Sequence, residues 1–594
     1  MNKGFAREPT QVIQSDDLTM KSTSLFTQEE IKGIKQRFNH MFSNKTYQNH
    51  KRRWLSIRDK QLPFWGDFLD SEDDEKGRKR DQGAVDGEAA RSNMILAGGM
   101  ASGLTPQSIQ WFKFSFEDTE LNEYHQAKVV LDARLEMISK VLAGSNFYNA
   151  SHTNYQELAF GQSPIGIFED PLRGVYFETY PIGCYAYEVD SFGVPCSFAV
   201  RKKYTAYQIK QKFQGAKLPD QIERDLKENQ GFQKEHDVCW LVEKNDKVDK
   251  KKLGNQFLPY ISMYWINGIS GNENDFLQVG GFHEFPIAIA RYQVVGNQAY
   301  GIGPGWYADG DVRMLYRMLQ EGFTNMELFS RPPLQTAGTM RVNTNPGGVT
   351  RNDMDKGKVE SLFNTMPIFK DIFEIANTNQ REFINRAYNT NLFAMLGQAS
   401  MNKSGRTAYE FALRDQEKMQ QLGPVVERQN GEYLGPILKR IYNILERAGV
   451  LPFFPQEVLE ELQGQKIEIE YVSPLAQAAK MSGTQNIEML LAMAAQTAQL
   501  NPDTIHLFDF VEILRSYASK TGTDTKLLVS PEAYQEKMDQ LAKAAQAEKE
   551  QAMIMAGGQP AQQYTQAAAN IQSMASEEDK PALETLLAAT GGGF

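Results

Sequence analysis

The chain has 594 residues, and 64 Lys and Arg against 74 Asp and Glu give a formal net charge of −10. Hydrophobic residues make up 41% and charged residues 23%, a composition typical of folded rather than disordered or fibrous proteins. A net acidic chain is not expected to read a specific DNA sequence, because such readers neutralise phosphates with clustered Lys and Arg. The length predicts about four structural units or one large elongated protomer.

Three Cys residues are too few, and odd in number, for a disulfide framework, so a reducing, intracellular setting is expected. Residues 1–17 lack the apolar core of a secretory leader. No run approaches the about 18 consecutive apolar residues that a membrane span needs. We therefore expect neither export nor a membrane segment.

The first part of the chain predicts several helices. Thr27 and Glu30 form a capping-box pattern, in which each side chain satisfies an otherwise unpaired backbone donor, so a helix should begin after Thr27. Small and apolar residues between 84 and 101 predict a close-packed helix, and an apolar face between 121 and 142 predicts another.

Between residues 164 and 292 the pattern changes. Short runs rich in Val, Ile, Tyr and Phe alternate with Gly, Pro and Asp, as strands and turns require. This part is predicted to be β-rich, with one helix between 205 and 214.

After Gly305 the pattern is helical again. Apolar stripes predict helices over 307–330 and 367–396, each about 30 Å or more long, around a Gly-, Asn- and Thr-rich excursion over 331–366. A linker over 397–406 precedes a long helical stretch to residue 448, with kinks expected at Gly423-Pro424 and Gly435-Pro436. The last third is predicted to be helical and to end in an Ala-, Gln- and Gly-rich tail.

Motifs for chemistry are incomplete. Gly397–Ser404 approaches a phosphate-binding loop, but Asn402 replaces the second required glycine and a helix, not a strand, precedes it. The glycine-rich stretch 300–305 does not complete a dinucleotide fingerprint. The pair His236 and Cys239 lacks a second pair of metal ligands, and Asp309 and Asp311 are better explained as helix-capping carboxylates. We predict no catalytic, cofactor or metal site and no enzyme activity.

Five segments in a specific order carry a family resemblance. They lie within about residues 30 to 480, and the chain resembles the head-to-tail connecting (portal) proteins of short-tailed bacteriophages. The segments are Leu96–Phe114; Asn154–Gly161; Pro181–Glu188; Phe285–Tyr292 with Tyr300–Gly305 and Asp311–Leu315; and Arg406–Glu410 with Arg414, Glu417, Leu422–Pro424 and Ser473–Ala476.

The resemblance implies an α+β, mainly helical portal fold with a β-rich wing, a two-helix stem, a clip and a helical crown. The implied parts are a flexible leader (1–25), the wing (26–306), two stem helices (307–330 and 367–396), the clip (331–366), a tunnel loop (397–406), a kinked helix returning to the wing (407–475) and the crown with a low-complexity tail (476–594).

The resemblance also implies site residues. The tunnel loop would bring Asn402, Lys403, Ser404 and Arg406 to DNA, although Arg406 could instead anchor the next helix. The stem would pack, within or between protomers, through Leu315, Leu319, Phe323, Ile372 and Phe383. The clip would meet an adaptor or terminase through Arg331, Arg341 and Arg351.

Members of this family form dodecameric rings at one capsid vertex, in the virion and, during assembly, in the host cytoplasm. Expected partners are further copies of the chain, double-stranded DNA bound without sequence specificity, a terminase, a tail adaptor, and major capsid and scaffolding proteins. Two alternatives stay open: another virion structural protein, of the tail or an internal scaffold, and a packaging ATPase or nuclease.

Overall fold

The computed structural model describes residues 26–473 apart from fourteen short segments, and five single residues beyond them. The segments left out are 69–85, 117–124, 171–172, 217, 229–230, 249–253, 255–256, 269–275, 332–333, 336–342, 344–359, 362–367, 394–415 and 455–466; the single residues are 513, 537, 538, 540 and 543. The chain divides into two compact units, 1–513 with 520–522 and 514–519 with 523–594, and nearly all described residues belong to the first.

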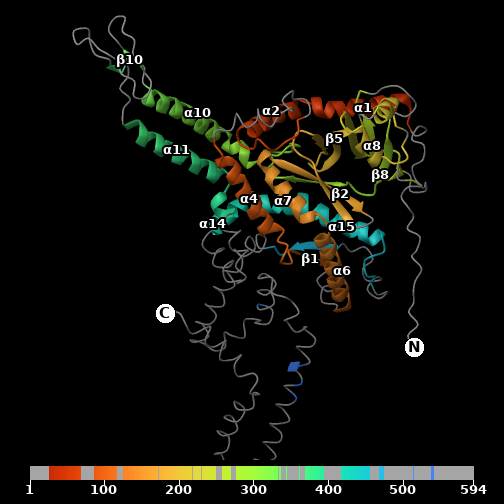
Figure 1. The fold of residues 1–594 in the computed structure, drawn as a ribbon. Helices are drawn as coiled ribbons and strands as arrows, with labels where there is room; N and C mark the ends of the chain where they lie inside the picture. The colour runs from red at the N-terminus through yellow and green to blue at the C-terminus, as the bar shows by residue number, and fades with distance from the viewer. Residues whose placement is uncertain are drawn as a thin grey trace, which may run out of the picture. The chain divides into compact units, whose positions relative to one another are not determined.

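The described part mixes helices with antiparallel sheets (Figure 1), so the predicted α+β class is confirmed. The helices are α1 (Gln28–Ser43), α2 (Lys45–Lys60), α4 (Glu88–Leu104), α6 (His125–Gly144), α7 (Phe147–Glu157), α8 (Ala206–Lys212), α9 (Asp220–Lys227), α10 (Pro304–Ser330), α11 (Ile368–Ala387), α14 (Gln416–Arg428) and α15 (Gly435–Arg447), with a 3-10 turn η4 (Leu158–Phe160) and a π-helix η7 (Gln429–Leu434).

The strands form four sheets, of order β4-β5-β6-β7-β8, β3-β2-β9, β1-β12 and β10-β11. Their bounds are β1 (Phe112–Phe116), β2 (Gln162–Asp170), β3 (Gly174–Thr179), β4 (Tyr185–Val189), β5 (Pro195–Thr205), β6 (Glu235–Lys244), β7 (Tyr260–Ile266), β8 (Gln278–Phe282), β9 (Ile287–Arg291), β10 (Leu334–Gln335), β11 (Glu360–Ser361) and β12 (Ile467–Tyr471).

Local signals placed the N-terminal helix and the β-rich region correctly. The Thr27 backbone N–H donates to the Glu30 carboxylate at 2.8 Å, and the Glu30 N–H donates to the Thr27 hydroxyl at 3.3 Å, which is the predicted capping box. A second capping box, at Thr205, starts α8 inside the β-rich region. Each strand run predicted between residues 164 and 292 corresponds to a strand from β2 to β7, and buried apolar side chains on both faces of these strands fill the core.

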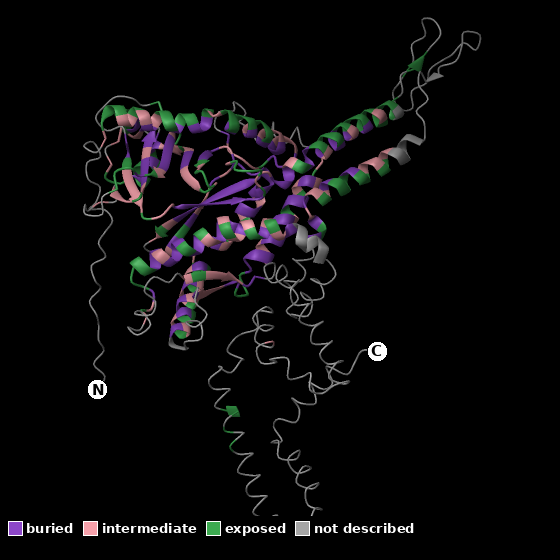
Figure 2. Cartoon of the chain, turned by 180° about the vertical axis from the view of Figure 1, so that it is seen from behind, coloured by how far each residue is buried: buried purple, intermediate pink, exposed green. Residues whose placement is uncertain are grey.

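The core of the described unit joins both larger sheets to α1, α2, α4 and α7 (Figure 2, buried residues in purple). An edge-to-face aromatic group lies where α2 meets the loop before α10: Trp54, Tyr47 and Tyr300 have ring centroids 5.4 to 5.9 Å apart. None of the helices in the described ranges is long and apolar enough to cross a membrane.

Three features differ from the sequence expectations. Strand β1 pairs with β12, about 350 residues later in the chain, and nothing local to either segment signals that pairing. Helix α11 ends at Ala387 rather than near 396, because Asn389 takes a left-handed conformation with φ 52°. Helix α14 continues through Pro424, and the irregular segment of this helical stretch is the π-helix η7, just before Gly435.

Folding changes the pKa of one buried carboxyl group. Glu157, at the end of α7, is 3% exposed, and its Oε2 atom has no hydrogen-bond partner in the described residues. Loss of solvent raises its pKa from 4.5 to about 8, and the Ile182 backbone N–H only partly opposes this.

We expect Glu157→Gln to make stability less sensitive to pH. Between pH 4.5 and about 8 the folded chain keeps a proton on Glu157 that the unfolded chain has lost, so stability falls as pH rises. The slope from this group approaches about 1.4 kcal/mol per pH unit. Urea unfolding of both proteins at pH 5.5, 7 and 8.5 should show the variant gaining relative stability at each step. A difference that is constant across pH would contradict the assignment.

Candidate functional site: the two-helix arm and its root

Helices α10 and α11 form a two-helix arm that extends from the packed part of the unit, called the body below (Figure 1). The root of the arm is the end at the body, where α10 begins at Pro304 and α11 ends at Ala387. At 27 and 20 residues they are about 40 and 30 Å long. Beyond their far ends the two-residue strands β10 and β11 pair antiparallel, Leu334 opposite Ser361 and Gln335 opposite Glu360. The predicted pair of long helices around an excursion is therefore present, with α10 starting three residues before its predicted position.

The two helices approach closely along the arm. A Cβ atom on Gly322 of α10 would lie 2.4 Å from the Phe373 ring of α11, so only glycine admits that ring. Nearer the body, the Gln380 amide donates to the Met314 sulfur at 3.4 Å. Leu315 and Leu319 are 1% and 8% exposed, so both predicted packing residues are buried within the protomer.

The apolar face of α10 continues beyond the part that the protomer covers. Phe323 and Met326 follow the buried Val312 and Leu319 at helical spacing, on the same face, yet they are 55% and 58% exposed. On α11, Ile375 is 62% and Phe383 44% exposed. Figure 2 shows the exposed residues along the outer part of the arm. The described residues therefore leave a stripe of large apolar side chains uncovered.

A buried carboxylate fastens α10 to α2. Asp309 is 3% exposed and accepts hydrogen bonds from the Ser56 hydroxyl at 3.0 Å, from Arg313 at 2.5 Å and from Arg53 at 3.4 Å. Two turns after Asp309, the Tyr316 hydroxyl donates to the Lys60 carbonyl at 2.8 Å. These bonds connect two elements about 250 residues apart and set the direction in which the arm starts.

The first turn of α10 sits against bare backbone. A Cβ on Gly303 would lie 2.2 Å from the Leu158 carbonyl oxygen and 2.5 Å from that of Ala159. The Trp54 and Trp306 indoles both donate to the Phe160 carbonyl, at 3.1 and 3.0 Å. Glycine is required here because the N-terminus of α10 lies directly on η4.

The root of α11 is held by a separate polar group on α4. The Asn385 amide donates to Glu88 at 2.9 Å and accepts from the Ser92 hydroxyl at 2.7 Å. Arg381 and Asp86 form an ion pair of 2.7 Å. Both helices of the arm are thus anchored by polar contacts, while their outer parts carry Phe323, Met326 and Ile375, the most exposed residues of the apolar stripe.

Most of the predicted contact residues lie outside the described ranges. This holds for the tunnel-loop residues and for two of the clip arginines; the backbone of Ile372 belongs to α11, but its side chain is not described. Arg331 is described: it caps α10, is exposed, and its N–H donates to the Glu327 carbonyl at 2.8 Å. The residues outside the description are Asn402, Lys403, Ser404, Arg406, Arg341 and Arg351.

The rejected chemical motifs have structural roles in the described residues. Asp309 is the helix anchor, and Gly301 and Gly303 pack on backbone. His236 pairs with Asp225 across 2.9 Å rather than with Cys239, whose pKa burial raises to about 12. Within the described part of the chain no group of three or more His, Cys, Asp or Glu is placed to hold a metal ion.

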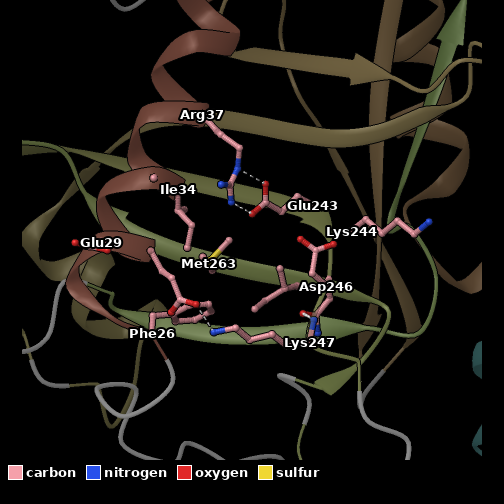
Figure 3. Close-up of a pocket in the computed structure, with 13 residues that line it drawn as sticks. Phe26, Glu29, Ile34, Arg37, Glu243, Lys244, Asp246, Lys247 and Met263 are labelled. Atoms are coloured by element: carbon pink, nitrogen blue, oxygen red, sulfur yellow. Dashed lines mark hydrogen bonds and ion pairs between the residues drawn. The ribbon is translucent and has the colours of Figure 1, made fainter.

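An open depression of about 410 Å³ lies between α1 and strands β6 and β7 (Figure 3). Two ion pairs cross it: Arg37 with Glu243 and Lys247 with Glu30, each at 2.7 Å. These pairs satisfy charges on both walls and hold α1 against the sheet. The depression is therefore explained by packing of α1 and needs no ligand.

Comparison with known proteins identifies the family. The model of the bacteriophage head to tail connecting protein family matches residues 32–528, most of the chain. The chain belongs to this family. A portal protein of Salmonella phage epsilon15 is 29% identical over 517 residues, covering 86% of this chain and 91% of the phage protein. A probable portal protein of Bordetella phage BPP-1 is 29% identical over 486 residues, covering 80% and 85%.

Membership gives this head-to-tail connecting protein its role as a structural component that links phage head and tail. The match also accounts for the resemblance carried by the five ordered segments. The sequence does not reveal the anchoring roles of Asp309 and Asn385, because their partners are hundreds of residues away. For Asp309 the sequence predicts only a helix cap.

Proposed function

We propose that this connecting protein is a portal: a ring at a single capsid vertex through which double-stranded DNA enters and leaves the head. The observation that carries the proposal is the two-helix arm with its uncovered apolar stripe. A chain that exposes Phe323, Met326 and Ile375 on one rigid extension is expected to cover them with further copies of itself.

In this proposal the arm is the stem. The excursion over 331–366 is the clip, residues 26–306 are the wing, 397–406 the tunnel loop and 476–594 the crown. Residues 407–475 return the chain to the wing, as supported by β12 pairing with β1 of the wing. A dodecamer is the expected ring, by analogy with the family.

The net negative charge supports a channel through which DNA moves rather than a site that binds DNA tightly. Each additional phosphate contact adds salt-dependent affinity and would slow a moving duplex. A chain of net charge −10 repels the DNA backbone overall and would touch it only at a few cations. The proposed partners are a terminase that drives packaging, a tail adaptor on the clip, and the capsid and scaffolding proteins around the wing.

The test is negative-stain electron microscopy of the purified full-length protein. The proposal expects wide-brimmed rings with a central hole, and a narrower projection formed by the arms. Fibres, or globular particles of monomer size at micromolar concentration, would exclude the ring. They would favour the alternative that the protein has another structural role in the virion.

Lys403 and Arg406 are proposed as the sparse tunnel contacts. Replacing both with glutamine should lower DNA packaging or retention in an infection-complementation assay and leave rings intact, because the change removes charge from a segment that the sequence predicts to be a linker. Normal packaging by the double variant would contradict the proposal. The single variants separate the alternative: if Arg406→Gln alone lowers the melting temperature, Arg406 anchors the following helix.

A further inference from the structure

Helix α2 has two opposed faces of different chemistry. Tyr47, Trp54 and Ile57 point into the core and are at most 2% exposed. The opposite face carries Lys45 and Arg52, both exposed, at a spacing of seven residues. Over its length this face carries cations and small polar side chains: Lys45, Asn49, Arg52 and Arg53 are exposed, whereas Ser56 and Lys60 are half-buried.

Two arginines of α10 extend this cationic face. Arg313 shares the Asp309 carboxylate with Arg53, so two positive charges meet one negative charge. The side chain of Arg317, one turn further, is 82% exposed. The set is called the basic ridge below and consists of Lys45, Arg52, Arg53, Lys60, Arg313 and Arg317. Figure 1 places α2 beside the root of α10, in agreement with their contacts.

The ridge stands out against the charge of the whole chain. Helix α2, residues 45–60, contains six Lys and Arg and one Asp, so 6 − 1 gives +5, whereas the whole chain has 64 − 74, or −10. Within the described residues, Lys45 and Arg52 make no ion pair or side-chain hydrogen bond. Asp59 is bonded to the buried Arg58, and Glu321 to Arg317. Among the described residues, therefore, too few carboxylates face the ridge to neutralise its charge.

We propose that the basic ridge binds the phosphate backbone of double-stranded DNA on the outside of the channel. About 22 Å of helix separates Lys45 from Lys60. That length spans several phosphates, since each strand presents one per about 3.4 Å of duplex axis. The proposal rests on the portal function for the presence of DNA beside the protein.

Other partner classes fit this surface less well. A membrane-binding helix needs an exposed apolar face, and the apolar face of α2 is buried in the core. A stable protein interface is centred on desolvated aromatic or aliphatic anchors, and the ridge presents none. Cations with short polar side chains and no apolar centre match a phosphate backbone, which they would bind without reading bases.

The experiment uses relaxed, covalently closed circular DNA, which cannot thread a closed ring and therefore reports only surfaces outside the channel. Binding by the full-length protein is measured by filter retention between 50 and 200 mM salt. The test variant is Lys45→Gln with Arg52→Gln. The matched control, Lys203→Gln with Lys210→Gln, removes the same charge from exposed positions on β5 and α8.

The test variant should lose about tenfold or more in affinity at 100 mM salt, and its plot of log affinity against log salt should be shallower by roughly 2. The control should match the unmodified protein. Equal binding by the test and control variants would overturn the proposal that the ridge binds DNA. An acidic protein as the true partner of the ridge would give this same result. Rings that form and package DNA with an inactive ridge would leave the portal function standing; absence of rings would count against that function alone.

Discussion

Replacing Gly303 with alanine should cost more than about 3 kcal/mol of stability and displace the root of the arm. The added Cβ would lie 2.2 Å from the Leu158 oxygen, 2.5 Å from the Ala159 oxygen and 2.6 Å from the Gly161 nitrogen. All three are backbone atoms of one tight segment, so no side-chain rotation relieves the overlap. Either α10 moves away from η4 or the segment before β2 distorts.

Gly310→Ala is the matched control, because it lies seven residues later in α10 with no atom within 4 Å of its Cβ position. Alanine there should be neutral or stabilise the helix by about 0.5–1 kcal/mol. Thermal melts and limited proteolysis near the arm root compare the two. If Gly303→Ala melts within a degree of the unmodified protein, α10 does not start against η4 as the structure has it.

Introducing a charge at Phe323 should abolish ring formation while the protomer stays folded. Phe323 is 55% exposed in the protomer, so Phe323→Asp buries no charge until a neighbouring copy covers the site. Assembly would then place a carboxylate in an apolar contact, at a cost of several kcal/mol per interface. Sedimentation velocity should show slowly sedimenting protomers, with a circular-dichroism melt close to that of the unmodified protein.

Leu319→Asp provides the contrast on the same helix. Leu319 is 8% exposed within the protomer, so its variant should lose both assembly and arm stability, by several kcal/mol. Phe323→Leu keeps an apolar side chain and should still assemble. Intact rings from Phe323→Asp would show that the outer stripe is not the contact between copies, and intact rings from Leu319→Asp would contradict the packing of the arm itself.

Several elements were readable from sequence because their causes are local. The capping box of Thr27 and Glu30 satisfies backbone donors three residues apart, so the start of α1 needs no distant partner. Short runs rich in Val, Ile, Tyr and Phe, separated by Gly, Pro and Asp, predicted the strands from β2 to β7 for the same reason. The two helices of the arm follow from apolar stripes at helical spacing, although their exact ends depend on Gly303 and Asn389.

The exposure of the outer apolar residues of the arm could not be predicted from the sequence. Val312, Leu319, Phe323 and Met326 form one apolar stripe in the sequence, and spacing alone assigns them a common environment. In the structure the body buries the first two and leaves the last two uncovered, because the helix extends past the elements that pack on its root. Burial depends on what lies opposite a side chain, which a one-dimensional pattern does not contain.

By itself the sequence determined the α+β class, the order of helical and β-rich regions, and the family, through five ordered segments that need no coordinates. Only the tertiary structure decided how the arm is anchored, which of its apolar residues await a partner, and that cations of α2 and α10 meet around Asp309. The physical reason is that helix caps, turns and periodicity act over a few residues, whereas Ser56 and Asp309 meet only after about 250 residues of intervening chain have folded.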